Sequence, residues 1–189
     1  RYLHCMPDGK MLVATVGGLI WFEPSEIPEL TVFNLVRKIP GDIHSLGNND
    51  VIYMFTSSCC DTWLCTFGGG LNRIRFVNGT PVFDVISTEN GLKSNIIQSA
   101  IEDGAGKIWA ATEAGLSSID PSERSVVNYS RYDGVPSVSF SEAACTSLDD
   151  GTLLFGTMEN VLCLNPETFS PSQKNGRLTV TGLAIDGRR

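Results

Sequence analysis

Short apolar runs, each of a length usual for a β-strand and separated by turn-forming residues, recur along the chain. They are rich in Val, Ile, Phe, Thr and Trp, which favour strands. One unit contains runs at 51–56, 63–67, 71–76 and 82–86, and the next has runs at 97–102, 108–112, 116–119 and 125–129. Asn78-Gly79 predicts a tight hairpin turn with positive φ at both residues. No window has a helical apolar period. Each unit therefore reads as a four-stranded antiparallel meander.

The same side chains return at a period of 46 residues, so that Trp63 and Thr66 correspond to Trp109 and Thr112. Looser copies flank this pair, at 8–19 and 150–166. A fixed period in the forties predicts one supersecondary unit stacked on its copies. Middle strands that are apolar on both faces need cover on two sides, which blades of a propeller give one another. We therefore predict an all-β fold: a β-propeller portion of about four blades, each a four-stranded antiparallel sheet.

The period divides the chain into expected blades at approximately 1–46, 47–92, 93–138 and 139–176, with 177–189 as the start of a following β-sandwich domain or a closing strand. The last unit shows no obvious fourth strand. Since four blades are the lower limit of a closed propeller, we expect a part of a larger ring. Uncovered blade faces would then make the isolated fragment self-associate. The chain opens without Met, which favours a mature product or an excised fragment.

The repeated residues are expected to be scaffold. The Trp fits between neighbouring blades, and the Thr on the second strand can bond across to a neighbouring turn. The position before that Thr holds Ala14, Cys65, Ala111 and Gly156 in the four units. This slot admits only small side chains, so we expect Cys65 to be a small buried hydrophobe.

Charge and composition exclude several classes of function. The chain has 189 residues and a net charge of −7, which argues against nucleic acid. No apolar run is long enough to span a membrane, so we expect no direct membrane insertion by this segment. Six cysteines without a CxxC spacing, and only two histidines, predict no metal site and leave any disulfide pairing open. No Gly-rich phosphate loop appears, and we expect no cofactor.

Chemistry in the chain favours binding over catalysis. A nucleophilic site needs a base beside its Ser or Cys, usually His, and only His4 and His44 exist. We therefore expect no catalytic residue. His4 lies in the first strand, whereas His44 lies in a loop that leads into the first strand of a blade.

Sugar sites combine aromatic platforms with planar polar groups on loops of a rigid scaffold. The loops entering each first strand are the candidates: 37–49, 87–95 and 131–139. The densest aromatic and polar cluster lies at the last loop, and the candidate ligand-binding residues are Tyr129, Arg131, Tyr132, Asp133, His44 and Asn95. An ordinary rim loop is the alternative for this cluster. Arg73 and Arg75 share a face of one strand, which is typical of a solvated outer edge.

Residues 103–121, which include Lys107-Ile108-Trp109-Ala110-Ala111-Thr112 and end at Asp120-Pro121, resemble the two-component-regulator propeller repeat. The closing unit, with Phe155-Gly156 and Asn165-Pro166, resembles the final blade of that family. Residues 178–187 look like the opening strand of the Y_Y_Y domain that follows it there. The first unit departs from the pattern, with Leu12 where Trp is usual.

The resemblance implies the periplasmic sensor region of a Bacteroidetes hybrid two-component system. Such a region is a receptor for a carbohydrate or glycan fragment, joined to further propeller blades, a Y_Y_Y domain, a membrane helix, a histidine kinase and a DNA-binding regulator. The segment itself would be non-catalytic and would signal when ligand shifts a population of domain arrangements. Two alternatives remain: a propeller lyase-like enzyme and a protein-interaction scaffold.

Overall fold

The computed structural model describes residues 1–135 and 139–169, and the strand expected within 177–189 lies outside them. Within these ranges the chain forms four antiparallel sheets, here called blades 1 to 4. Blade 1 contains β1 (Tyr2–Cys5), β2 (Met11–Thr15), β3 (Gly18–Phe22) and β4 (Asn34–Val36). Blade 2 contains β5 (Val51–Thr56), β6 (Thr62–Thr66), β7 (Leu71–Val77) and β8 (Thr80–Ile86). Blade 3 contains β9 (Ile97–Glu102), β10 (Ile108–Thr112), β11 (Gly115–Asp120) and β12 (Ser125–Tyr129). Blade 4 contains β13 (Phe140–Ser147), β14 (Leu153–Thr157) and β15 (Val161–Leu164).

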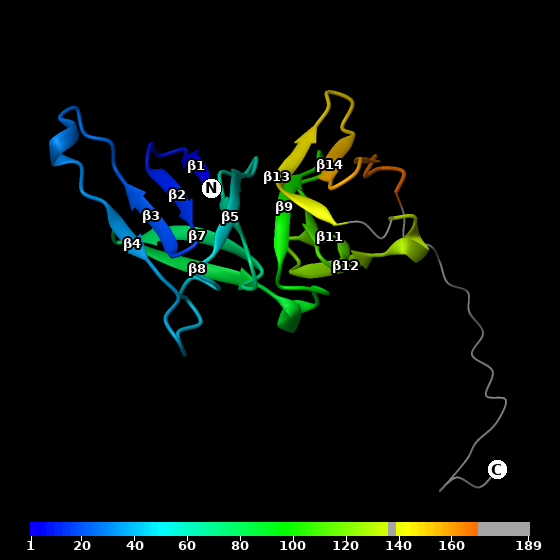
Figure 1. Ribbon diagram of the computed structural model, residues 1–189, viewed down its shortest axis with the longest axis horizontal. Helices are drawn as coiled ribbons and strands as arrows, with labels where there is room; N and C mark the ends of the chain where they lie inside the picture. The colour runs from blue at the N-terminus through cyan, green and yellow to red at the C-terminus, as the bar shows by residue number, and fades with distance from the viewer. Residues whose placement is uncertain (136–138, 170–189) are drawn as a thin grey trace, which may run out of the picture.

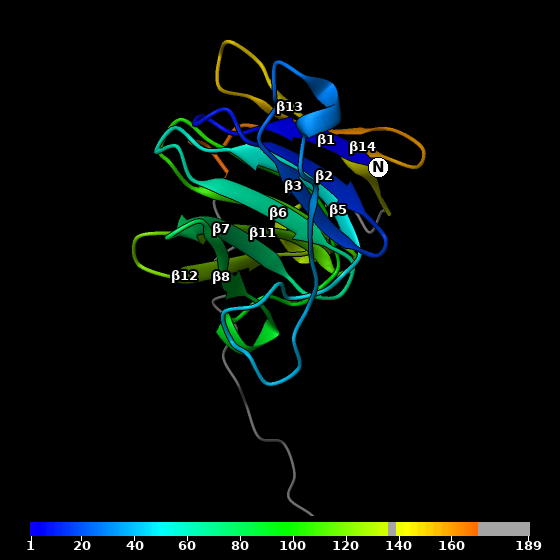
Figure 2. The same cartoon turned by 90° about the vertical axis from the view of Figure 1, so that its left-hand side faces the viewer.

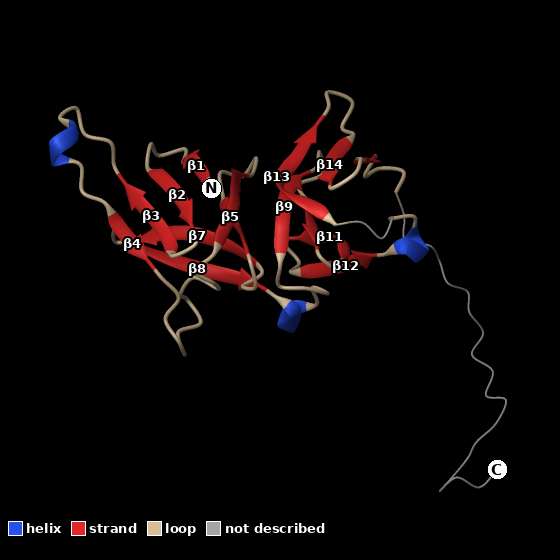
Figure 3. Cartoon of the chain, in the orientation of Figure 1, coloured by secondary structure: helices blue, strands red, loops and turns tan. Residues whose placement is uncertain are grey.

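Each blade is a meander in which neighbours in sequence are neighbours in the sheet. Three short 3-10 helices, η1 (Pro28–Leu30), η2 (Thr88–Asn90) and η3 (Arg131–Asp133), are the helical elements of the described residues (Figure 3). Asn78 and Gly79 connect β7 to β8 with φ values of 51° and 77°. This confirms the hairpin turn predicted from the sequence. The predicted all-β propeller fold is confirmed as well.

The first strand of every blade lies toward the middle of the molecule (Figure 1), where β5 contacts β1, β9 and β13. Because the strands alternate in direction, the loops divide between two faces. The blade 1–2 and blade 2–3 connections, on the lower side of Figure 1, and the second-to-third strand turns form what we call the loop face. The first-to-second strand turns form the turn face, on the upper side. Figure 2 shows the molecule from the side of blade 1, with the other blades behind it.

Apolar side chains fill each of the three interfaces between successive blades. Trp63 of blade 2 packs with Ile97, Ala100 and Ile108 of blade 3, and Trp109 packs with Phe140 and Phe155 of blade 4. Both indoles are buried, as the sequence predicted for a ring between blades.

The slot before the repeated Thr is closed to large side chains. Ala14, Cys65 and Ala111 are buried, and a Cβ on Gly156 would press against the Cβ of Ala144. Burial raises the pKa of the Cys65 thiol, which keeps it protonated and unreactive. The expectation of a small buried hydrophobe at Cys65 is confirmed.

The repeated Thr closes the second-to-third strand turn in all four blades. Its hydroxyl donates to the carbonyl of Gly18, Gly70, Gly115 or Asn160 at 2.6–2.8 Å and accepts a backbone N–H from within the same turn. One side chain therefore satisfies two backbone groups at the tip of each blade. This is the local structural reason for the repeat of Thr.

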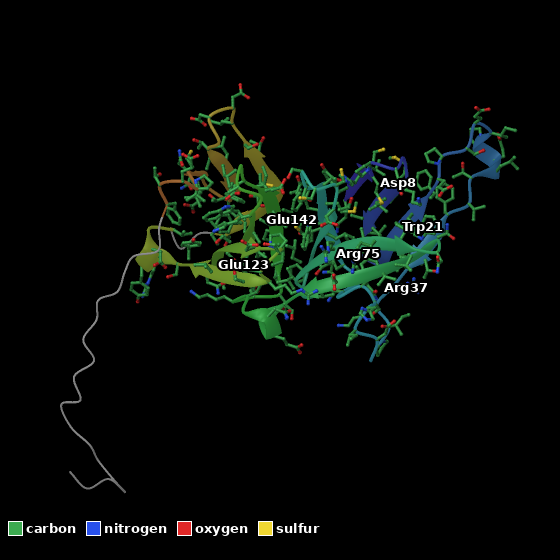
Figure 4. The ribbon with its side chains drawn as sticks, turned by 180° about the vertical axis from the view of Figure 1, so that it is seen from behind. Asp8, Trp21, Arg37, Arg75, Glu123 and Glu142 are labelled. Carbon is green, nitrogen blue, oxygen red and sulfur yellow. The ribbon has the colours of Figure 1, made fainter. Side chains whose placement is uncertain are left out.

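Blade 1 replaces the interface Trp by another route. Leu12 fills the Trp position and is buried, and its cross-strand partner is Trp21 on β3. The Trp21 ring meets Phe76 of blade 2 edge-on at 4.9 Å between ring centroids. Figure 4 shows Trp21 on this outer blade. Blade 1 therefore carries its indole on the third strand, whereas blades 2 and 3 carry theirs on the second strand. The Trp21 indole still fills the gap between blades 1 and 2.

One face of blade 1 is apolar and uncovered by any described residue. Leu3 and Val13 are cross-strand partners on this face, and Leu3 is 64% exposed. The equivalent pairs, Met54 with Leu64 and Ala100 with Ala110, are fully buried under the preceding blade. Blade 1 thus carries the residues of a blade interface on an open surface.

Arg1, directly ahead of β1, links blade 1 to the start of blade 2 and to blade 4. Its guanidinium forms salt bridges of 2.9 Å with Asp50, ahead of β5, and with Glu142 on β13. Glu142 lies on the side of blade 4 that faces the first two blades (Figure 4). The charged contact therefore spans the middle of the molecule, where the four first strands gather.

Candidate functional site

A hollow of about 470 Å³ opens on the loop face between the blade 1–2 connection and the blade 2–3 connection. We call it the loop-face groove. Its polar and charged lining residues are Lys38, Asp42, His44, Ser45, Asp84, Ser87, Glu89, Asn90, Asn95 and Arg124, and the turn residues Gly68 and Gly69 form part of its wall. Two of the six predicted ligand-binding residues, His44 and Asn95, lie in this groove. Its volume falls in the range of small-molecule sites.

The loop carrying His44 is held by backbone hydrogen bonds. The His44 N–H donates to Asp42 Oδ1 at 2.9 Å, and the His44 carbonyl accepts from the Phe83 N–H of β8 at 2.9 Å. Further along, a Cβ on Gly47 would collide with the Gly69 carbonyl, so this loop lies directly on the second-to-third strand turn of blade 2. The exposed His44 side chain is therefore presented from a backbone anchored on both sides.

Asn95 builds the opposite wall. Its side-chain Oδ1 accepts from the Thr88 N–H at 2.8 Å, and its Nδ2 donates to Thr88 Oγ1 at 3.2 Å. Its backbone carbonyl accepts from Gly68 and Gly70 of the neighbouring turn. The amide thus holds η2 and orders the groove, and the exposed polar groups of this wall are those of Glu89 and Asn90 on η2 itself.

Positive and negative charges meet at the outer end of the groove. Asp84 on β8 binds Arg73 at 2.7 Å, Arg75 at 3.1 Å and, from blade 3, Arg124 at 3.2 Å. The hydrogen bond from Arg73 is the main reason why the pKa of Asp84 is lowered, with the charges of all three arginines adding to it. Arg73 and Arg75, expected on a solvated edge, share this carboxylate (Figure 4 labels Arg75).

The other four predicted residues lie elsewhere and are divided in two. Tyr129 is buried, stacked on Trp109 at 5.3 Å, in the wall of a second hollow of about 300 Å³ between blades 3 and 4. Arg131, Tyr132 and Asp133 form η3, where the Arg131 guanidinium lies over the Tyr132 ring at 4.7 Å. Asp133 accepts from the Ser130 N–H and caps η3. The structure does not gather these four side chains around one cavity.

Several residues of the loop-face groove were not predicted individually. Lys38, Asp42, Glu89 and Asn90 lie in loops that the sequence did nominate, 37–49 and 87–95. Arg124 comes from the turn after β11 and has a positive φ of 54°. Nothing in the local sequence connects it to a groove lined by residues 38–47, because the contact depends on how blade 3 packs on blade 2.

The lining of the loop-face groove favours polar ligands. It supplies planar carboxylate, amide, imidazole and guanidinium groups, but its described residues include no Phe, Tyr or Trp platform.

Among the described residues, no three His, Cys, Asp or Glu side chains gather so as to hold a metal ion. No helix in the described ranges is long and apolar enough to cross a membrane.

Comparisons with known proteins give relatives of one main class. No protein-family model matches the chain. A histidine kinase of Formosa agariphila is 24% identical over 96 residues, which is 51% of this chain and 7% of that protein. The extracellular domain of a putative hybrid two-component system from B. thetaiotaomicron is similar over 88% of this chain and 28% of its own, with 19% identity and a TM-score of 0.50.

A further structural neighbour has a different biological role. PorZ of Porphyromonas gingivalis, described as an essential bacterial surface component of the type-IX secretion system, matches 86% of this chain and 25% of its own at 12% identity and a TM-score of 0.64. The chain thus spans less than a third of each of these relatives. The neighbours include extracellular domains of hybrid two-component systems, the class that the sequence resemblance predicted, and they share the propeller fold.

Proposed function

We propose that this chain is the ligand-sensing extracytoplasmic portion of a hybrid two-component sensor histidine kinase, located in the periplasm, and that it binds a carbohydrate or glycan fragment in the loop-face groove. The observation that carries the proposal is the groove itself, a polar hollow built by two blade connections that are both anchored to the same turn at Gly68–Gly70. The similarity to extracellular domains of hybrid two-component systems supports a sensor role.

The chemistry of the groove suits hydroxyl groups. Each sugar hydroxyl both donates and accepts, and the groove offers donors on Lys38 and Arg124 and acceptors on Asp42 and Glu89. Both signs of charge are present, so a neutral ligand finds charged donors and charged acceptors in the same groove. The groove takes residues from the blade 1–2 and blade 2–3 connections, and a ligand that bridges them would stabilise one arrangement of these loops over others.

The uncovered face of blade 1 supports a larger assembly in the parent protein. Its partner would be another blade of the same repeat, because Leu3 and Val13 occupy positions that blades 2 and 3 bury under a neighbouring blade. A following Y_Y_Y domain, a membrane helix and kinase and regulator modules complete the proposed parent. The 189-residue chain alone should then self-associate through this face. Light scattering tests this, and a compact monomer would contradict it.

A thermal-shift screen of oligosaccharides tests the ligand proposal. A ligand at a hundredfold excess over its Kd should raise Tm by about 5–10 °C, from a linkage term of about 2.7 kcal/mol. The variants His44→Ala and Glu89→Ala should weaken this response, since both side chains line the groove and are exposed. Tyr132→Ala is the matched control, because Tyr132 is a predicted ligand residue outside the groove. Loss of the response in Tyr132→Ala alone would move the site to η3.

The similarity to PorZ supports one alternative, a protein-interaction scaffold on the cell surface. Propeller folds host unrelated functions, so fold alone does not decide between sensor and scaffold. A scaffold predicts no stabilisation by any oligosaccharide in the same screen. Turnover of a stabilising ligand would favour the third possibility, a lyase-like enzyme.

A further inference from the structure

Of the two Trp residues at the repeated interface position, Trp63 is the one whose indole N–H has no acceptor among the described residues. It is 2% exposed, and its Nε1 is buried without a hydrogen-bond partner. Its counterpart in blade 3, Trp109, donates Nε1–H to Asp103 Oδ2 at 2.7 Å. A buried donor without an acceptor is rare in folded proteins and needs an explanation.

The missing acceptor is explained by the repeat. The 46-residue register places Ser57 where blade 3 has Asp103, and the two turns are otherwise alike: Ser57 N–H donates to the Asp61 carbonyl and Asp103 N–H to the Lys107 carbonyl, both at 2.8 Å. The Ser57 hydroxyl donates to the Asp61 carbonyl and does not accept from the Trp63 indole.

Blades 1 and 4 show that the two positions change together. The positions of Asp103 and Trp109 hold Met6 with Leu12 in blade 1 and Leu148 with Leu154 in blade 4. An apolar turn residue accompanies Leu, and a carboxylate accompanies Trp in blade 3. Blade 2 alone combines the Trp donor with a turn residue that leaves it unsatisfied.

A hollow of about 240 Å³ lies at this turn, on the turn face between blades 2 and 3. We call it the turn-face groove. Ser57, Asp61 and Trp63 line it from blade 2, as do Glu102, Asp120 and Pro121 from blade 3. Because Asp103 of the equivalent turn bonds Trp109, the repeat places Trp63 Nε1 on the Ser57 side of the indole, and Ser57 and Trp63 both line this groove.

Three carboxylates line the turn-face groove together with Trp63, and each is already oriented. Asp61 accepts from Arg73 Nη1 at 3.1 Å. Glu102 reaches across the blade interface to accept from the N–H and hydroxyl of Ser58, at 2.6 and 3.0 Å. Asp120 Oδ1 accepts from the N–H and hydroxyl of Ser122, at 2.9 and 2.6 Å, and from the N–H of Glu123 at 3.2 Å. A carboxylate has about four lone-pair sites, so each of these groups keeps free acceptor capacity.

From this arrangement we infer that the turn-face groove is a second binding site, which takes a neutral polyhydroxylated molecule of about the size of one sugar ring. One hydroxyl oxygen of the ligand accepts from Trp63 Nε1, and its hydroxyl hydrogens donate to the carboxylates. An anion is disfavoured by three carboxylates, and a cation leaves the indole N–H unsatisfied. The groove lies on the face opposite to the loop-face groove, so the inference does not depend on the proposed function.

The indole N–H signals of the three Trp residues report on this site directly. In ¹⁵N-labelled protein, Trp63→Phe identifies the Trp63 resonance by its loss. D-glucose, D-galactose, D-mannose and myo-inositol are then titrated into the tens of millimolar range, with D-glucuronate as the charged comparison. At least one neutral compound should move the Trp63 signal saturably, the Trp109 signal should stay in place, and glucuronate should have no effect.

Two substitutions at Ser57 form a matched pair. Ser57→Asp recreates the acceptor of blade 3, so it should satisfy Trp63 internally and weaken binding by about tenfold or more, as expected for loss of one buried hydrogen bond. Ser57→Ala leaves the N–H free and should retain binding. If Ser57→Asp fails to fold, Trp63→Phe takes its place, because it removes the donor and keeps an aromatic ring in the interface. Binding to that variant is followed through the NMR signals of the ligand.

Three outcomes would overturn the inference. These are the absence of a saturable shift with all four neutral compounds, a shift that persists unchanged in Ser57→Asp, and an equal response to glucuronate. In the first case water alone occupies the groove. A negative result here leaves the oligosaccharide response at the loop-face groove unaffected, because His44 and Glu89 are not part of the turn-face groove.

Discussion

Replacing Asp103 by Ala should destabilise the propeller more than any comparable change in an exposed turn. The Asp103 carboxylate accepts three hydrogen bonds, from the N–H groups of Ala105 and Lys107 at 2.9 Å and from Trp109 Nε1 at 2.7 Å. The first two donors lie in an exposed turn, where water replaces the carboxylate. The indole N–H lies at a blade interface, where Trp109 is 3% exposed.

The expected magnitude follows from these three contacts. An unsatisfied buried donor costs about 1–3 kcal/mol, and an exposed turn bond contributes about 0.5 kcal/mol. We therefore expect Asp103→Ala to lower the free energy of unfolding by about 2–4 kcal/mol. Asp150→Ala is the matched control, because Asp150 accepts from the Thr152 N–H in an exposed turn of blade 4 and not from a buried indole. Its expected cost is about 0.5 kcal/mol.

Denaturation in urea, followed by both Trp fluorescence and circular dichroism, measures the two free energies by linear extrapolation. The two probes must give coincident transitions, since a repeat protein can unfold in parts. Equal losses for Asp103→Ala and Asp150→Ala would refute the reasoning, because they would show that the Trp109 N–H has no need of Asp103.

Further predictions concern strain, charge and pH. Cys60 has a φ of 64° where the equivalent residues are Gly9, Gly106 and Gly151, so Cys60→Gly should stabilise the chain by about 0.5–1 kcal/mol in the same assay, whereas Cys59→Gly should not. Asp84→Asn should lower the free energy of unfolding by about 1–2 kcal/mol at low salt and by less at high salt. The substitution removes the carboxylate charge that three arginines of blades 2 and 3 share. Burial lowers the pKa of His4 below 6.5, so the contribution of His4 to the free energy of unfolding should be constant above that pH and fall as pH decreases from 6.5 through the folded-state pKa. In His4→Gln the corresponding part of this slope should disappear from unfolding curves recorded across that pH range.

Much of the scaffold could be predicted from the sequence because its determinants are local. Strand length, β-branched composition and turn residues define each meander, and a type I′ turn at Asn78-Gly79 follows from the backbone freedom of those two residues. The interface position of Trp63 and Trp109 and the small slot at Cys65 follow from comparing repeats, since equivalent positions share one environment. The candidate site was predicted less well. His44 and Asn95 do lie in one groove, but Asn95 uses its amide to hold η2, and Tyr129 is buried against Trp109.

The sequence by itself determined the blades, their order and the residues that join them, because a repeat of period 46 encodes contacts that every copy makes with its neighbour. Only the tertiary structure decided which loops share a cavity and which polar groups are left without partners. The presence of Lys38 and Arg124 in the lining of one groove, and the unsatisfied N–H of Trp63, depend on distances between segments that are remote in the chain. The physical reason is that hydrogen-bond satisfaction is a property of the packed assembly, and no local pattern of residues records it.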